Sequence, residues 1–204
     1  MASSKWLVKR GNKMLQQKQN ATITYTGVET PIGLVFAAFS RGALYRISSG
    51  TETEFLQNIS PTAGEVPIRA DSILNDYARQ ILAVFTGDTP AHLPLYLETL
   101  TPFQQKVLNM TAKIPRGQVR SYGWIAQAIG SPNAHRAVGT ALAQNPLPFV
   151  IPCHRVVRAD GQLGSYSGGG TAVKARLLTL EEVPVAQAAG KFMVPKPFDP
   201  IYQP

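Results

Sequence analysis

The sequence predicts an α+β protein of two domains: a small antiparallel sheet with one packed helix, then a mostly helical part with a helix-turn-helix and the only cysteine. Strand-like runs are confined to the first half, whereas helical spacing of apolar residues dominates the second. The change falls in a proline-bounded stretch, residues 89–101. With 204 residues, 44% of them hydrophobic, the chain is long enough to fill a sizeable core.

Three runs rich in β-branched and aromatic residues lie at 22–28, 34–39 and 43–47. The turn signals Thr30-Pro31-Ile32-Gly33 and Arg41-Gly42 separate them. We expect these runs to pair as a small antiparallel sheet.

A helix is expected at residues 71–85, where apolar side chains recur at helical spacing. These side chains are Ile73, Leu74, Tyr77, Ile81, Leu82 and Phe85. Gly87 follows and is a typical helix stop. The amphipathic pattern predicts that this helix packs on the sheet.

The second half begins with Thr101-Pro102-Phe103-Gln104, in which Thr caps, Pro takes the first helical position and Gln completes a capping box. This predicts a helix that runs to about residue 114. Two shorter helices are expected at 121–129 and, capped by Asn133, at 133–144, with the turn Gly130-Ser131-Pro132 between them. The arrangement resembles a DNA-docking unit, although many helical proteins join helices in the same way.

These elements predict four segments. Residues 1–20 form a basic extension, 21–92 the sheet-plus-helix domain, 93–183 the helical domain and 184–204 an extended tail whose prolines oppose further helix.

The net charge of +8 is concentrated in one part of the chain. Residues 101–180 carry nine basic side chains against a single acid, Asp160, and the remainder of the chain is formally neutral. Such segregation favours a polyanion partner for the second half, with a solvated basic face as the alternative.

No run approaches the roughly 18 consecutive apolar residues of a membrane-spanning helix, because even residues 146–152 are short and cut by proline. We expect no membrane association. The first twenty residues lack the apolar core of a secretory signal, although a transit peptide stays open.

The single cysteine excludes an intramolecular disulfide and a cysteine-based structural zinc site. A lone cysteine is most often a small buried hydrophobe. Here it stands in Pro152-Cys153-His154-Arg155-Val156, where a neighbouring imidazole or guanidinium can favour the thiolate. Adjacent side chains of an extended chain point apart, so a water could have to bridge Cys153 and His154.

This run resembles the active-site signature of the O6-alkylguanine-DNA alkyltransferases, also called methylated-DNA–protein-cysteine methyltransferases. Further blocks lie in the family's order and close to its spacing: Arg136-Ala137-Val138-Gly139, Asn145-Pro146, Gly164-Ser165-Tyr166-Ser167-Gly168-Gly169 and Ala172-Val173-Lys174. The resemblance is specific over residues 102–182 and general over the N-terminal half.

The resemblance implies DNA repair in which the alkyl group of O6-alkylguanine moves irreversibly to Cys153, with O4-alkylthymine left open as a second substrate. The base would be flipped out of double-stranded DNA, and each molecule would act once, without metal or other cofactor. A monomer is expected, with cooperative binding to DNA left open. The implied location is cytoplasmic, at the nucleoid of a bacterium or in the nucleus of a eukaryote. A structural zinc site, as in some family members, is not expected because the N-terminal half has no cysteine and only His92.

The family pattern also assigns roles to single residues. The catalytic set is Cys153, His154, Glu181, Tyr122 and Asn145, and the adjacent Glu182 leaves the choice of glutamate open. The substrate-binding set is Arg136, Tyr166, Ser167, Val156, Pro148 and Leu142. The DNA-binding set is Arg136, Ala137, Gly139, Ser121, Tyr122 and Ala134.

Two other functions fit parts of the pattern. A non-catalytic sensor of alkylated DNA would keep the DNA-binding helices without needing the thiol. A cysteine hydrolase would use Cys153 and His154 but would leave the Arg136 helix unexplained.

Overall fold

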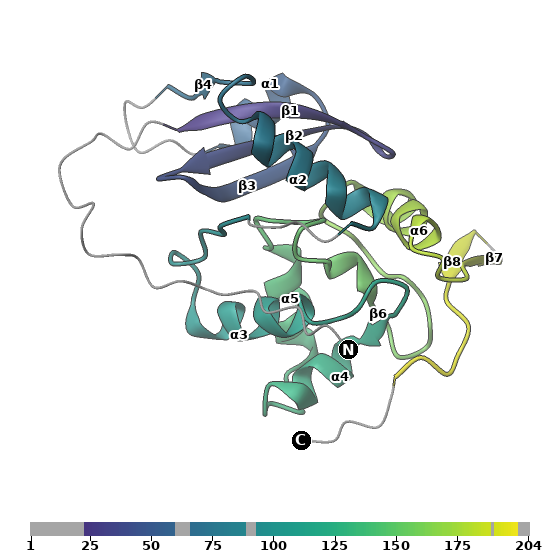
Figure 1. Cartoon of the computed structure of the whole chain (residues 1–204). Coiled ribbons are helices and arrows are strands. Elements are labelled where there is room, and N and C mark those ends of the chain that lie inside the picture. Colours follow the sequence, from purple (N-terminus) through teal and green to yellow (C-terminus); the bar gives the residue numbers. More distant parts are fainter. Residues whose placement is uncertain (1–22, 60–65, 89–92, 189, 200–204) are drawn as a thin grey trace.

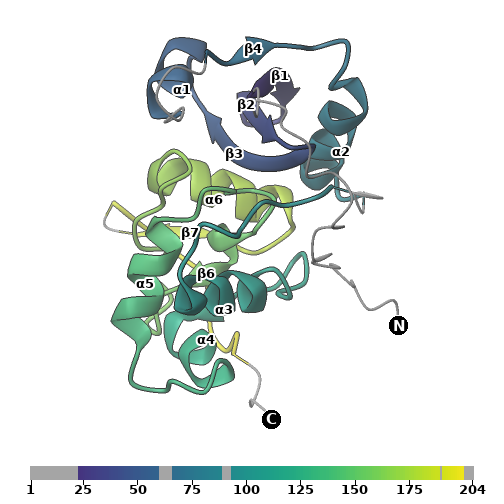
Figure 2. The same ribbon diagram turned by 90° about the vertical axis from the view of Figure 1, so that its left-hand side faces the viewer.

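The computed structural model describes residues 23–59, 66–88, 93–188 and 190–199. A small sheet with two helices forms one side of the molecule, and the remaining helices form the other (Figures 1 and 2). The predicted α+β class, with the sheet first and the helices after it, is confirmed. The basic extension at 1–20 lies outside the described residues.

The sheet has the order β3-β2-β1-β4. Strands β1 (Thr24–Thr30), β2 (Gly33–Ser40) and β3 (Ala43–Ser49) are antiparallel, as predicted, and each ends one or more residues later than expected. The two-residue β4 (Ile68–Arg69), which pairs parallel to β1, and α1 (Glu52–Asn58) were not predicted.

Strand β2 is buried on both faces, which explains its continuous apolar run. Its alternate residues Phe36 and Ala38 pack in a cluster with Phe55 of α1. The opposite face, with Val35, joins a second cluster that extends into the helical half. Because side chains alternate along a strand, one short run supports two cores.

Helix α2 (Asn75–Thr86) begins later than the predicted residue 71. Asp71 is instead tied to the sheet, since its carboxylate accepts hydrogen bonds from Thr26 Oγ1 and Arg69 Nε, both at 2.8 Å. Ile73 is 79% exposed and does not belong to the buried face. The predicted stop is confirmed: Gly87 has φ 95° and its N–H bonds to the carbonyl of Ala83.

Helix α3 (Pro102–Thr111) has the expected capping box. It ends at Thr111 rather than near residue 114, because the N–H groups of Lys113 and Ile114 bond three residues back and Pro115 follows. The first helix of the predicted helix-turn-helix, α4 (Tyr122–Ala128), is capped by Ser121, whose Oγ accepts from the N–H of Trp124 at 3.0 Å.

The second helix of this unit, α5 (His135–Ala143), starts two residues later than predicted. The Asn133 cap was wrong: the cap position is Ala134, and no side chain bonds to the helix end there. Asn133 lies instead in a turn closed by the bond from the N–H of Ala134 to the carbonyl of Ser131, at 2.9 Å.

The free edge of β3 joins the two halves of the chain. Leu44 exchanges backbone hydrogen bonds with the stretch after the first domain, through Pro94 O at 2.8 Å and Tyr96 N at 2.9 Å. Further along, the N–H of Ile47 donates to the carbonyl of Pro146 at 3.0 Å. The two halves on either side of the proposed boundary after residue 92 are therefore joined by backbone hydrogen bonds along the edge of β3.

The described part of the tail is packed against the helical half. Strands β7 (Ala186–Ala188) and β8 (Lys191–Met193) form a hairpin after α6 (Gly170–Leu180). Beyond it Val194 is buried, and its N–H donates to Gly161 O at 2.9 Å. Further on, the Asp199 carboxylate accepts the N–H of Ser121 at 2.7 Å, so the end of the described chain reaches the start of α4.

Replacing Val194 by Ala tests whether the tail stabilises the fold. The substitution removes two methyl groups from a buried cluster, which should lower the free energy of unfolding by about 2 kcal/mol. Urea denaturation measures this change. The control Ile73→Ala, on an exposed side chain, should change stability by less than about 0.5 kcal/mol; equal effects of the two substitutions would show that the tail does not contribute through packing.

Candidate active site

The chain that follows α5 is buried but irregular, and Asn145 organises it. Its Oδ1 accepts the N–H of Leu147 at 3.0 Å, the local turn that Asn favours. Its Nδ2 donates to Ile151 O at 3.1 Å and to Cys153 Sγ at 3.2 Å. One amide thus fixes the end of α5, the following turn and the thiol.

Pro152 gives the chain the bend that presents Cys153. With φ −77° and ψ 63° it is the centre of an inverse γ-turn, closed by the bond from Cys153 N to Ile151 O at 2.7 Å. The proline ring presets this φ. A single turn of 3-10 helix, η1 (Cys153–Arg155), follows directly and carries the thiol and the imidazole.

Phe149, in the same segment, has the unusual φ of 71° for a bulky residue. Its ring is buried and packs against Phe85 of α2, with centroids 5.3 Å apart. It also meets Tyr166 edge-on at 6.4 Å. Packing from the N-terminal half therefore supports a strained position beside the thiol.

The side chains of His154, the residue after Cys153, and Glu181 form a buried pair. His154 Nε2 lies 3.0 Å from Glu181 Oε1, and both side chains are buried. The two residues are far apart in sequence, and α6 brings the glutamate to η1.

The end of α6 decides which of the two adjacent glutamates points inward. Val183 N bonds to Leu178 O at 2.9 Å and Glu182 N to Thr179 O at 3.0 Å, which is a Schellman motif with Glu182 in the left-handed region at φ 64°. Val183 and Leu178 share a buried cluster, as this motif favours. Glu181 is therefore buried and Glu182 exposed.

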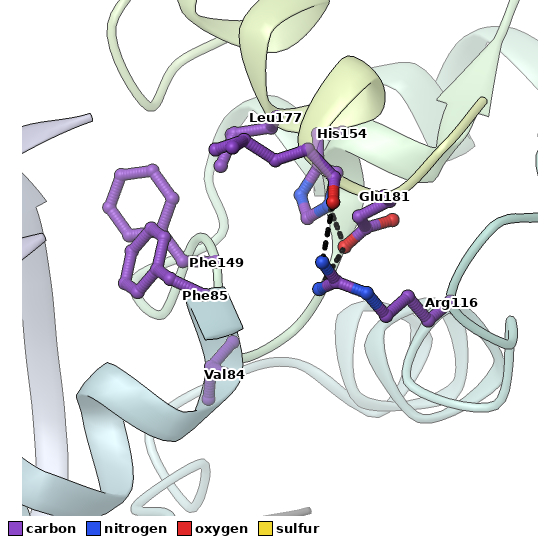
Figure 3. A pocket seen from close by; sticks show the side chains of 8 residues that line it. Val84, Phe85, Arg116, Phe149, His154, Leu177 and Glu181 are labelled. Carbon is purple, nitrogen blue, oxygen red and sulfur yellow. Dashed lines mark hydrogen bonds and ion pairs between the residues drawn. The ribbon is translucent and has the colours of Figure 1, made fainter. Parts of the chain in front are cut away.

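Two arginines surround the carboxylate of Glu181. Arg155 binds it through Nε to Oε2 at 2.8 Å and Nη2 to Oε1 at 2.7 Å. Arg116 also lies near Glu181, with Nη1 3.9 Å from Oε1 and Nη2 donating to Leu180 O at 2.6 Å (Figure 3). Burial alone would raise the pKa of Glu181, but the hydrogen bonds from His154 and Arg155, together with the positive charge of Arg155, outweigh it and lower the pKa to about 2.

His154 is neutral for a related reason. Burial lowers its pKa despite the bond to Glu181, and the positive charges of Arg155 and Lys174 act in the same direction as burial. Because an ionised carboxylate only accepts hydrogen bonds, the proton of the neutral ring is assigned to Nε2. Nδ1 then holds a lone pair, and it is buried without a hydrogen bond to any described residue.

The thiol is not ionised at rest. Burial raises the pKa of Cys153, whereas the bond from Asn145 and the charge of Lys174 act against the increase. Lys174 is itself buried, donates to Val156 O and Leu163 O at 2.6 Å each, and has its pKa lowered by burial to about 8. Cys153 therefore needs a base before it can act as a strong nucleophile.

A cavity of about 340 Å³ opens in front of Cys153. This volume lies within the roughly 300–1,000 Å³ typical of small-molecule sites. Its walls come from α4, α5 and the loop before α6: Tyr122, His135, Arg136, Gly139, Leu142, Ala143, Cys153, Arg158, Gly164, Ser165, Tyr166 and Ser167. A second space, beside His154 and Glu181, measures only about 10 Å³ and is too small for a base (Figure 3).

The structure brings four of the six predicted substrate-binding residues to this cavity: Arg136, Leu142, Tyr166 and Ser167. Tyr122 also lines it, and burial raises the pKa of the Tyr122 phenol, which keeps its proton. Pro148 and Val156, both buried, are not among the residues that line it. The carbonyl of Val156 already accepts from Lys174.

The predicted DNA-binding residues divide in the same way. Arg136 and Ala137 are exposed on α5, and Ala134 and Gly139 are partly exposed near them. Ser121 is only 4% exposed, with its Oγ used to cap α4 and its N–H bonded to Asp199. Its predicted role as a DNA contact therefore has little support in the geometry.

Three basic residues that bind Glu181 or act on the pKa of Cys153 were not placed in any of the predicted site sets. Lys174 lies among apolar residues of α6, and this unusual surrounding was the available signal. Arg155 belongs to the recognised signature, where its guanidinium was considered as a group that favours the thiolate; in the structure it binds Glu181 instead. Arg116 has no sequence signal, because only the fold brings its loop to the end of α6.

A buried thiol that lines a base-sized cavity, with a buried neutral imidazole on the same turn of 3-10 helix, defines a protein that uses one cysteine as a nucleophile. Residues 102–183 match the family described as 6-O-methylguanine DNA methyltransferase, DNA binding domain. The chain is 38% identical over 165 residues to the constitutive methylated-DNA–protein-cysteine methyltransferase of Bacillus subtilis (strain 168), a match that covers 78% of this chain and 95% of the relative. The mouse enzyme of the same name is 34% identical over 187 residues, covering 85% and 88%.

Solved structures agree with the sequence matches. Mycobacterium tuberculosis OGT in complex with DNA aligns with a TM-score of 0.64 at 35% identity, covering 78% of this chain and 92% of that one. The O6-methylguanine-DNA methyltransferase of Pyrococcus kodakaraensis KOD1 aligns with a TM-score of 0.62 at 29% identity, covering 79% and 100%. The chain belongs to the methylated-DNA–protein-cysteine methyltransferase family.

The lowered pKa of Glu181 predicts an acid-sensitive stability. A carboxyl whose pKa falls from 4.5 to about 2 on folding stabilises the native state above pH 4.5, and this contribution is lost as the pH falls toward 2. The stability difference between wild type and Glu181→Gln should therefore shrink by roughly 3 kcal/mol from pH 5 toward 2. Urea denaturation as a function of pH measures it. Glu182→Gln, a matched change on the exposed neighbour, should show no such convergence; if both variants behave alike, the buried ion pair is not the cause.

Proposed function

We propose that this chain repairs DNA by transferring the alkyl group of O6-alkylguanine, typically methyl, to the sulfur of Cys153, once per molecule. The observation that carries the proposal is a buried Cys153 thiol that lines a base-sized cavity and is followed directly in the chain by the buried, Glu181-bound His154. No helix among the described residues is long and apolar enough to cross a membrane. We further propose a cytoplasmic location, at the nucleoid in a bacterium or in the nucleus of a eukaryote.

The neutral imidazole supplies the base. Nδ1 of His154 takes the thiol proton through a bridging water, while Glu181 holds the Nε2 proton and stabilises the imidazolium that forms. The thiolate then attacks the alkyl carbon in line with the C–O6 bond, so that the S–C bond forms as the C–O6 bond breaks. The leaving guanine takes a proton at N3, and we assign this donation to the Tyr122 phenol because it lines the cavity and burial keeps it protonated.

The thioether product explains why one molecule acts once. The alkyl group is held to Cys153 by a thioether bond, and acid-base catalysis by His154 does not break an S–C bond of this kind. The free thiol is therefore not regenerated. Neither a metal ion nor a diffusible cofactor enters the proton and electron balance, because the protein is itself the acceptor.

Guanine within a duplex is stacked and paired, so it must be extruded at a cost of roughly a few kcal/mol. We assign the space left in the stack to Arg136, which is exposed on α5 and lines the cavity. The small residues Ala134, Ala137 and Gly139 let α5 approach the minor groove closely. Leu142 and Tyr166 would form the walls around the base, with Ser167 and backbone groups near Cys153 binding its polar edge.

Intact mass spectrometry tests the transfer. After incubation with a duplex that contains O6-methylguanine, wild type should gain one methyl group per chain, located at Cys153 by peptide mapping. Cys153→Ser should gain none. A wild-type protein that binds this duplex tightly but stays unmodified would instead be the non-catalytic sensor.

Arg136→Ala tests base extrusion. Duplex repair should slow by about ten- to a hundredfold, about 1.4 to 3 kcal/mol of barrier, whereas reaction with free O6-benzylguanine should change far less because no stack has to be filled. Single-turnover rates on both substrates measure this. Arg176→Ala removes an exposed charge on α6 and controls for general electrostatics; equal losses on both substrates would contradict the role of Arg136.

A further inference from the structure

Arg158 lies at the mouth of the active-site cavity and has no part in the mechanism above. Its aliphatic stem lies over Gly164: a Cβ atom on that glycine would be 3.7 Å from Arg158 Cγ and 3.6 Å from the Tyr122 hydroxyl. The side chain is 57% exposed. The positive charge of Arg158 is thus open to solvent, on the side of the cavity that Tyr122 lines.

The guanidinium is held by a partner that can release it. Arg158 Nη2 lies 3.0 Å from Asp160 Oδ2, and Nε lies 3.3 and 3.2 Å from the two carboxylate oxygens. Asp160 also accepts from Gln162, through the backbone N–H at 3.0 Å and Nε2 at 3.2 Å. The carboxylate would therefore keep two hydrogen bonds if the arginine moved away, and an exposed ion pair contributes little to stability.

The turn does not need the arginine side chain either. Backbone bonds close it, from Arg158 N to Gln162 O and from Gly161 N to Arg158 O, both at 2.9 Å. Bracing this turn is thus a weak explanation for an arginine at the rim.

An extruded nucleotide supplies a fitting ligand. When its base enters the cavity, the flanking phosphates remain at the rim, where the planar fork of a guanidinium can bind two phosphate oxygens at once. Arg136 and Arg158 are the cavity-lining residues with fixed positive charge, and Arg136 is assigned to the base stack.

We propose that Arg158 exchanges Asp160 for a phosphate next to the extruded nucleotide and so holds the flipped guanine in the cavity. The inference rests on the proposed function. It makes Arg158 a substrate-binding residue that acts on DNA but not on a free base.

The test combines Arg158→Gln with duplexes in which single phosphates around O6-methylguanine are replaced, one at a time, by an uncharged methylphosphonate. Arg158→Gln should slow single-turnover repair of the unmodified duplex by about tenfold, since a charge-assisted bidentate contact is lost. One methylphosphonate should slow wild type to a similar extent and add nothing further in the variant, the signature of two changes that remove one contact. Arg176→Gln is the matched control and should respond to every duplex as wild type does.

Reaction with free O6-benzylguanine, which uses Cys153 and Tyr122 but has no phosphate, should fall far less in Arg158→Gln than duplex repair. An equal loss would overturn the proposal, because it would show that Arg158 acts through Tyr122 or the cavity itself. Equal sensitivity of wild type and variant to every methylphosphonate would overturn it as well. If wild type leaves Cys153 unmodified, the proposed function is what fails, and equilibrium binding of the same duplexes tests the Arg158 contact.

Discussion

The active-site segment depends on one constraint: a buried chain without regular secondary structure must find partners for its backbone polar groups elsewhere. Asn145 supplies two of these bonds from its side chain, Lys174 binds the Val156 carbonyl, and β3 reaches Pro146 from the other half of the molecule. These partners come from the segment itself, from α6 and from β3. The position of the thiol is therefore a property of the whole fold rather than of the short signature around it.

The same network keeps Cys153 protonated in the resting protein and provides a separate base, His154, to ionise it. Burial keeps Cys153 protonated and His154 neutral, and the carboxylate of Glu181, held by Arg155, keeps the His154 proton on Nε2. A buried ion pair of this kind contributes little net stability, but losing one partner would leave an uncompensated charge. The arrangement holds His154 in one tautomer, ready to act as a base, and leaves Cys153 as a thiol rather than as a permanently reactive thiolate.

Local signals predicted much of the fold because they act over a few residues. The capping box at Thr101 and the stop at Gly87 were placed correctly. Helix α1 was missed even though Thr51 and Glu54 form a capping box, because the helix is short and only Phe55 is buried. The start of α2 was displaced by Asp71, whose sheet contacts no periodicity reveals.

The site shows the same limit. The signature and family spacing brought Cys153, His154 and Glu181 into one hypothesis, and the Schellman motif then explains why Glu181 rather than Glu182 turns inward. Arg116 and the packed tail depend on tertiary contacts between distant segments, which no local pattern contains.

The way the two edges of the sheet are closed bears on self-association. An open edge strand offers unpaired backbone groups to another molecule and invites aggregation. Here β3 is covered by the chain's own segments around Pro94 and Pro146, while the opposite edge ends in the two-residue β4, where Arg69 and Asp71 place charges beside β1. Each molecule uses its only cysteine once, so stoichiometric repair requires one copy for every lesion. The closed edges allow many copies to be present with little strand-to-strand assembly.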